Sequence, residues 1–92
     1  MSRIVHNPQE SRYELYLDDQ LASYADYRAK DDHLVFDHTE TASHLRGRGL
    51  AAELVEWALK DVRKRGLKVV PQCSFVADFI EAHPEYQRFL SA

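Results

Sequence analysis

Hydrophobic and polar residues alternate along the first half of the chain in three short segments. The segments are residues 11–17, 21–28 and 33–39. Tyr13 and Leu15 occupy alternate positions of the first segment, which predicts a strand with one apolar face. In the third segment the same alternation predicts that Leu34, Phe36 and His38 share one face. Short acidic turns separate the segments, so we expect a three-strand antiparallel meander.

The spacing of hydrophobic residues changes at Gly49 to that of a helix. Leu50, Leu54 and Trp57 fall on one stripe, which predicts a helix that buries this stripe, with Trp57 in the core. Basic residues crowd the last turn, where cations stabilise the helix dipole. Gly66 follows at the position typical of a C-terminal cap, so the predicted helix ends there.

The chain after this helix supplies one more strand and one more helix. Residues 67–70 form a short apolar run that ends at Pro71, and Ser74 stands where it would cap a second helix. A strand, a helix and a strand in direct succession predict a crossover in which the last strand runs parallel to the third. We therefore predict an α+β fold with an α/β, three-layer-like arrangement, built from the meander, the crossover and a C-terminal helix.

The composition is typical of one intracellular domain. The chain has 92 residues, of which 45% are hydrophobic and 29% charged, so we expect a single domain over residues 1–92. A net charge of −3 does not favour a nucleic-acid or membrane-surface partner. The sequence contains no apolar run that would span a bilayer, no recognisable signal peptide and only one cysteine. These features predict a cytoplasmic protein without an internal disulfide.

The most informative stretch is the R-G-R-G turn at residues 46–49, directly before the long helix. The first turn of a helix has unpaired N–H groups and partial positive charge, and glycines let an anion approach the backbone. Arg46 and Arg48 add charged donors. The plainer interpretation is a flexible loop with solvated arginines.

Two other phosphate motifs fit the turn less well. The pattern G-x-G-x-x-A through Ala52 formally matches a dinucleotide fingerprint. The chain is too short for a doubly wound sheet, however, and no acidic residue near Val70 would bind a ribose. A Walker A loop is excluded because no Gly-Lys-Ser/Thr sequence follows.

The turn and three further landmarks resemble the GNAT acetyltransferase superfamily. The segment R-G-R-G-L-A at residues 46–51 resembles its R/Q-x-x-G-x-G/A motif, which binds the pyrophosphate of acetyl-CoA. The landmarks are H-T-E at residues 38–40, P-x-C-x-F spanning 71–75 and H-P-E-Y at 83–86. Together they resemble the small single-domain group of the superfamily over nearly the whole chain. The resemblance implies a minimal GNAT fold and an N-acetyltransferase that uses acetyl-CoA as co-substrate.

The resemblance also implies where coenzyme A would bind. Backbone N–H groups of about residues 47–51 would bind the pyrophosphate, and the pantetheine arm would lie along an edge freed by splaying of the third and fourth strands. The expected cofactor-binding residues are Thr39, Thr41, Arg46, Gly47, Arg48, Gly49, Leu50 and Ala51. The chain lacks the helices usually found between the first two strands, and also the C-terminal strand pair. Those segments commonly form the acceptor wall, so the identity of the acceptor stays open.

Three residues are candidates for the chemistry of acetyl transfer. The reaction needs a deprotonated amine, a polarised thioester and a protonated leaving thiolate. The strand order is expected to bring His38, Glu40 and Cys73 into one pocket, with Glu40 or His38 as the base. Cys73 would carry the acetyl group transiently or protonate the leaving coenzyme A. The plainer alternatives are a solvated glutamate, a strand-end histidine and a small buried thiol.

Three functions remain open on these grounds. The first is an acetyl-CoA-dependent N-acetyltransferase acting on a small-molecule or protein amine. The second, motivated by the missing acceptor wall, is a sensor or interaction module that binds CoA or acyl-CoA without chemistry. The third is an α+β partner-binding domain without a nucleotide. The histidines and the single thiol show no metal-ligand spacing, so no metal is expected. An exposed edge of the meander could pair with a second copy and form a homodimer.

Overall fold

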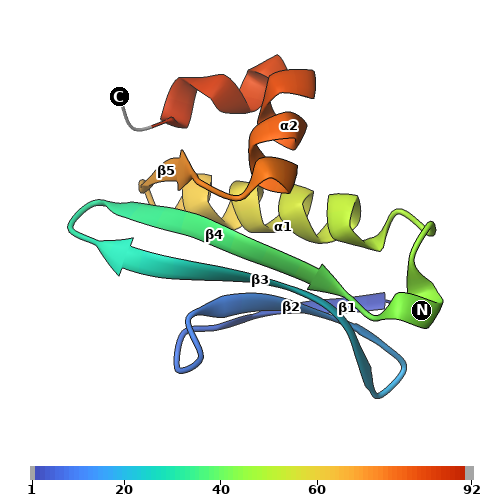
Figure 1. Cartoon of the computed structure of the whole chain (residues 1–92). Coiled ribbons are helices and arrows are strands. Elements are labelled where there is room, and N and C mark those ends of the chain that lie inside the picture. Colours follow the sequence, from blue (N-terminus) through green and yellow to red (C-terminus); the bar gives the residue numbers. More distant parts are fainter. Residues whose placement is uncertain (1, 91–92) are drawn as a thin grey trace.

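The protein forms one mixed sheet with a long helix across it (Figure 1). The computed structural model describes residues 2–90, apart from the side chain of Phe89. In chain order the elements are β1 (Ser2–Asn7), β2 (Arg12–Leu17), β3 (Gln20–Lys30), β4 (His33–Thr41), the short 3₁₀ helix η1 (Ser43–Leu45), α1 (Leu50–Lys64), β5 (Lys68–Pro71), α2 (Ser74–Ala82) and the 3₁₀ helix η2 (Pro84–Phe89). The strands lie in the order β1-β2-β3-β4-β5.

The strand pairing confirms the α+β class and the parallel crossover. The four N-terminal strands pair antiparallel in sequence, and β5 pairs parallel with β4. β1 was not predicted; it pairs with β2 from Ser2 opposite Leu17 to Asn7 opposite Arg12. The meander therefore has four strands rather than three, and β1 forms its free edge.

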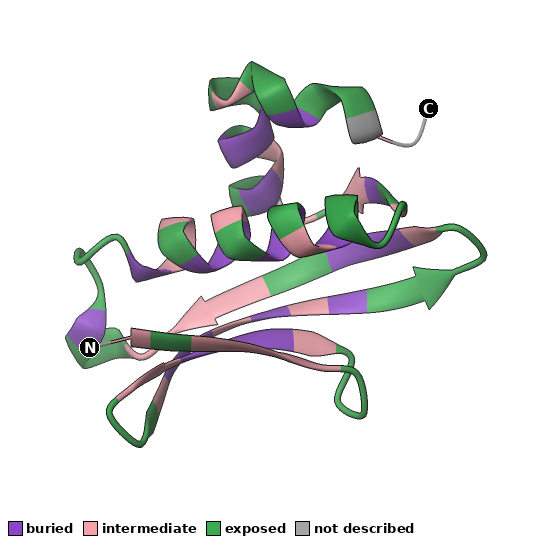
Figure 2. Cartoon of the chain, turned by 180° about the vertical axis from the view of Figure 1, so that it is seen from behind, coloured by how far each residue is buried: buried purple, intermediate pink, exposed green. Residues whose placement is uncertain are grey.

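α1 buries its apolar stripe against one face of the sheet and contacts every strand (Figure 2). Leu54, Leu59 and Val62 are completely excluded from solvent. Trp57 was predicted to lie in the core but is 38% exposed, because it stands at the margin of the stripe. Gly66 follows the helix with a φ of 70°, so it adopts the left-handed conformation of a C-terminal cap. Within residues 2–90, neither helix is long and apolar enough to cross a membrane.

α2 stands at the β5 edge of the sheet and contacts α1, β4 and β5 (Figure 1). The predicted cap was misplaced by one residue: Cys73 is the N-cap, and Ser74 is the first helical residue. The helix buries Val76 and Ile80. Its end is closed by His83, whose Nδ1 lies 2.8 Å from the carbonyl oxygen of Phe79.

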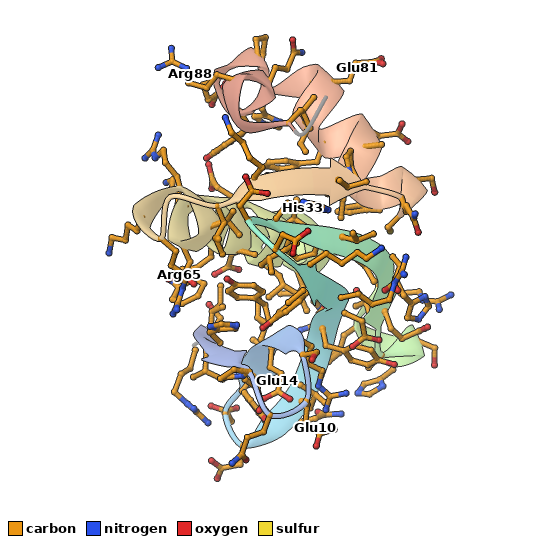
Figure 3. All side chains as sticks on the ribbon, turned by 90° about the vertical axis from the view of Figure 1, so that its left-hand side faces the viewer. Glu10, Glu14, His33, Arg65, Glu81 and Arg88 are labelled. Atoms are coloured by element: carbon orange, nitrogen blue, oxygen red, sulfur yellow. The ribbon has the colours of Figure 1, made fainter. Side chains whose placement is uncertain are left out.

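No helix among the described residues covers the face of the sheet opposite α1, and this face carries polar and aromatic side chains. We call it the open face. Its centre is Glu14, which is only 3% exposed and accepts hydrogen bonds from Asn7, Arg12 and Tyr16. Burial would raise the pKa of Glu14, but these three hydrogen bonds lower it below its ordinary value. The Arg12 guanidinium also lies 4.7 Å from the ring centre of Tyr24. Figure 3 labels Glu14 among the side chains of the N-terminal strands.

A partly buried polar cluster joins β1, β2 and β3 to the end of α1. The Tyr13 hydroxyl and Arg65 Nε both donate to Asp61 Oδ2, each at 2.7 Å. His6 stacks on Tyr13 with ring centres 4.4 Å apart, and its Nε2 lies 2.6 Å from the Tyr27 hydroxyl oxygen. Burial lowers the pKa of His6 below its ordinary value of 6.5; Arg65 adds to this effect, and Asp61 opposes it. The cluster therefore holds the edge strand best while His6 is neutral.

We predict that the protein loses stability as the pH falls through and below 6.5, the ordinary pKa of histidine, because of His6. The unfolded chain binds a proton at His6 near its ordinary pKa, whereas the folded state binds it only at lower pH. Acid therefore favours the unfolded state across this window. The measurement is the free energy of unfolding by urea at each pH. In a His6→Gln variant the slope should become shallower, and in a control His44→Gln variant, which alters an exposed imidazole on η1, it should persist. An unchanged slope in His6→Gln would contradict the assignment.

Candidate functional site

The sheet opens where the pairing of β4 with β5 ends. The two strands are in register from His33 opposite Lys68 to Phe36 opposite Pro71. Pro71 has no N–H to extend the ladder. The last hydrogen bond between the two segments runs from the Cys73 N–H to the Phe36 carbonyl, at 2.8 Å. The chain then turns into α2. β4 continues to Thr41, paired with β3 alone. Residues 37–41 thus have a free edge on the β5 side, among the residues that the structure describes.

Two left-handed glycines shape the turn between η1 and α1. Gly47 and Gly49 have φ values of 85° and 74°, a conformation that costs other L-residues about 1–2 kcal/mol. An added Cβ would meet no other atom within 4 Å at either position. Backbone conformation, rather than internal crowding, therefore calls for glycine here. Gly49 is the N-cap of α1, and it offers no side chain to cap the first N–H groups. The positive end of α1 is left without a side-chain acceptor.

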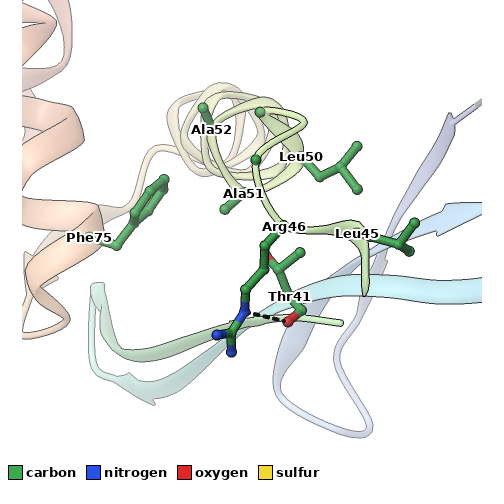
Figure 4. Close-up of a pocket in the computed structure, with 9 residues that line it drawn as sticks. Thr41, Leu45, Arg46, Leu50, Ala51, Ala52 and Phe75 are labelled. Atoms are coloured by element: carbon green, nitrogen blue, oxygen red, sulfur yellow. Dashed lines mark hydrogen bonds between the residues drawn. The ribbon is translucent and has the colours of Figure 1, made fainter. Parts of the chain in front are cut away.

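This uncapped helix end opens onto a pocket of about 220 Å³ (Figure 4). The pocket is lined by Thr41, Leu45, Arg46, Gly47, Gly49, Leu50, Ala51, Ala52 and Phe75. Six of these were expected to bind the cofactor, whereas the expected Thr39 and Arg48 are not in the lining. Leu45, Ala52 and Phe75 were not predicted to line it. Ala52 follows the motif by one residue in the first turn of α1, and this position indicates that it lines the same space. The position of Phe75 depends instead on how α2 packs.

A chain of polar side chains runs along the outer side of β4. Arg46 Nη2 lies 3.2 Å from Glu40 Oε2, and Glu40 Oε1 lies 3.2 Å from His38 Nε2. Arg46 Nε also donates to the Thr41 carbonyl at 3.3 Å. The side chains of His38 and Glu40 are 51% and 42% exposed. Arg46 thus connects the pocket at the α1 end to the carboxylate and imidazole of β4.

A β-bulge corrects the predicted face of His38. Tyr27 pairs with Phe36, but the residue before it, Asp26, pairs with His38, so Asp37 is an extra residue in β4. The bulge reverses the alternation that would have placed Phe36 and His38 together. Phe36 stays in the core, while His38 turns to the open face, where its ring centre lies 6.1 Å from that of Tyr24.

Cys73 belongs to a different group of side chains from His38 and Glu40. Its Sγ lies 3.6 Å from Oγ1 of Thr39, and the thiol is partly buried against the core. Because neighbouring side chains of a strand point to opposite faces, Thr39 lies on the α1 side, and its neighbours on β4 point to the open face. The single pocket expected for His38, Glu40 and Cys73 is therefore divided by β4 into an inner thiol side and an outer imidazole and carboxylate side.

Ser23 anchors the freed end of β4 to β3. Its side chain is buried, and the hydroxyl donates to the Glu40 carbonyl at 2.9 Å and lies 3.0 Å from Oγ1 of Thr41. These two contacts hold the freed end of β4 against β3.

Among the described residues, His, Cys, Asp and Glu side chains form no group of three that could hold a metal ion.

Comparisons with known proteins identify the family and the fold. The model of the family described as GCN5-related N-acetyl-transferase matches residues 12–89, most of the chain. The solution structure of a GCN5-like protein from Staphylococcus aureus superposes with a TM-score of 0.73 at 23% sequence identity. The match covers 98% of this chain and 88% of that one, so the two share a fold. The family match includes the glycine turn, the freed edge of β4 and the start of α2, and the chain therefore belongs to the GCN5-related N-acetyltransferase family.

Proposed function

We propose that the protein transfers the acetyl group of acetyl-CoA to an amine. The observation that carries this proposal is the uncapped N-terminus of α1, which opens onto a pocket beside the freed edge of β4. A helix end of this kind binds anions through its N–H groups and its dipole. The freed edge offers a row of backbone groups to an extended ligand. Both features are needed for a molecule with a pyrophosphate at one end and an amide-containing arm at the other.

The pyrophosphate would lie against the first turn of α1. Gly47, Gly49, Leu50 and Ala51 surround this space, and the glycines leave the backbone uncovered. Arg46 contributes positive charge from the same pocket, although its guanidinium is held by Glu40 and the Thr41 carbonyl. Arg48 lies in the turn itself with an exposed side chain that does not line the pocket, and it would act at longer range.

The arm of the ligand would follow β4 from Thr41 toward Thr39. Amide groups of pantetheine can pair with the backbone of residues 37–41 as an added strand does. This path brings the thioester to Thr39 and Cys73, where the hydroxyl and the thiol are already in contact at 3.6 Å. Cys73 also stands at the N-cap of α2.

The chemistry would use the two sides of β4 for different steps. An amine approaching from the open face meets Glu40 and His38, which accept its proton directly or through a water. The amine nitrogen then attacks the thioester carbonyl, the carbon–sulfur bond breaks, and the leaving thiolate takes a proton. Cys73 and Thr39 are the proton donors closest to the proposed position of the sulfur. Both reactants are bound at once, so we expect a ternary-complex mechanism.

One observation favours the second candidate function, a CoA-binding sensor. His38 and Glu40 are about half exposed, and no described element covers the open face in front of them. Acetyl transfer would be faster if a protein surface next to His38 and Glu40 oriented the acceptor and excluded water. A large acceptor, such as the surface of another protein, would supply this wall itself.

Coenzyme A binding should be abolished or strongly weakened by Ala51→Glu. The new carboxylate would occupy the pocket and repel phosphate, and a glutamate in the first turn suits the helix dipole, so α1 should stay folded. We expect at least about a tenfold increase in Kd for coenzyme A by calorimetry. The control is Ala29→Glu, which adds the same charge at the end of β3 that lies away from the pocket. If Ala51→Glu binds coenzyme A like the wild type, the pyrophosphate assignment is wrong.

Turnover should depend on Glu40 even though coenzyme A binding does not. In Glu40→Gln the base is lost, while the new amide oxygen can still accept the hydrogen bond from Arg46. We therefore expect kcat to fall by about a hundredfold with little change in the Kd for acetyl-CoA. Release of free coenzyme A thiol is measured with a panel of small amines and lysine peptides. Glu81→Gln, on an exposed position of α2, is the matched control. Full activity of Glu40→Gln would remove its role as base, and binding without turnover in the wild type would favour the sensor.

A further inference from the structure

Phe75 is a large apolar side chain that the fold leaves in solvent. It is 38% exposed, whereas Val76, Phe79 and Ile80 of the same helix are buried. Within the described residues Trp57 is the other large hydrophobic residue with this exposure. Keeping a phenyl ring partly in water forgoes stabilisation that burial would give. A binding role would account for its position.

The ring of Phe75 belongs to the pocket at the start of α1. Ala51, Ala52 and Leu45 line the same pocket and add apolar surface from α1 and η1. Figure 4 shows Phe75 reaching from α2 toward Ala52 and Ala51, on the far side of the pocket from Leu45. Both alanines are small, so the first turn of α1 leaves room for a ligand in front of the ring. The pocket thus combines backbone donors with an aromatic wall.

We propose that Phe75 packs against the branched pantoyl portion of coenzyme A, the segment with two methyl groups next to the pyrophosphate. This inference rests on the proposed binding of coenzyme A. The pyrophosphate would lie at the turn of α1 and the thioester at Cys73, so the arm must pass between them. Phe75 comes two residues after Cys73 on the same chain segment, which places it on the pantetheine side of the pyrophosphate rather than the adenine side.

The contact would fix the start of the arm before it joins the edge of β4. The pantoyl methyl groups are the most apolar part of the arm, and the ring would bury them against the alanines of α1. The remaining amide groups are then directed along residues 37–41 toward Thr39. Phe75 is therefore a positioning residue for the thioester as well as a source of affinity.

Two ligands separate this contact from pyrophosphate binding. Coenzyme A carries the pantoyl group, while adenosine 3′-phosphate 5′-diphosphate contains only the nucleotide and pyrophosphate portion. Each is titrated by calorimetry into the wild type, Phe75→Ala, Phe75→Tyr and Trp57→Ala. Trp57→Ala is the matched control because it removes an equally exposed aromatic side chain that does not line this pocket. Circular dichroism melts check that the variants are folded.

Phe75→Ala should weaken coenzyme A by about tenfold and leave the affinity for the nucleotide fragment unchanged. Phe75→Tyr, which keeps the ring, and Trp57→Ala should bind both ligands like the wild type. The inference is overturned if Phe75→Ala binds coenzyme A normally, or if it loses affinity for both ligands equally. If the wild type binds neither ligand, the proposed function fails and this inference fails with it.

Discussion

The end of pairing between β4 and β5 is the constraint on which the rest of the site depends. Up to Phe36 and Pro71 the two strands form a parallel ladder, and beyond it β4 continues without β5. Proline cannot donate to the ladder, so the separation is built into the sequence at the point where the chain must turn into α2. The crossover through α1 places the ends of β4 and β5 next to each other. The glycine turn before α1 leaves the N-terminus of that helix without a side-chain cap. The break in the ladder and the turn before α1 thus bring a freed edge, a helix end and a thiol into the same region.

The freed strand also separates two chemical environments. On the α1 side Thr39 and Cys73 are in contact and partly buried, and the apolar core continues beneath them. On the open face His38 Nε2 and Glu40 Oε1 lie 3.2 Å apart, and both side chains are accessible to solvent. A thioester lying along the edge of β4 would be reached by an acceptor from one side and by proton donors from the other. In the proposed reaction the sheet would keep the base and the leaving group apart, which suits a reaction that removes one proton and supplies another.

The sequence was sufficient for features set by local pattern and insufficient for those set by packing. Helical spacing from Leu50 and the cap at Gly66 located α1, and the succession of elements gave the parallel β5. β1 was missed because its short run around Ile4 is only half buried and becomes a strand by pairing with β2. The side of β4 that His38 takes was missed because a bulge of one residue has no marker in the sequence. Phe75 reaches the pocket only through the placement of α2, so no local pattern could assign it.

The most direct test of the central claim is the response of backbone amides to coenzyme A, followed by two-dimensional NMR of the labelled 92-residue chain. The account predicts chemical-shift changes concentrated at residues 47–52 and 37–41, where the helix end and the freed edge meet the ligand, with little change in the β3–β4 hairpin at residues 29–33. Unchanged spectra at millimolar coenzyme A, or changes confined to residues away from these two segments, would contradict it.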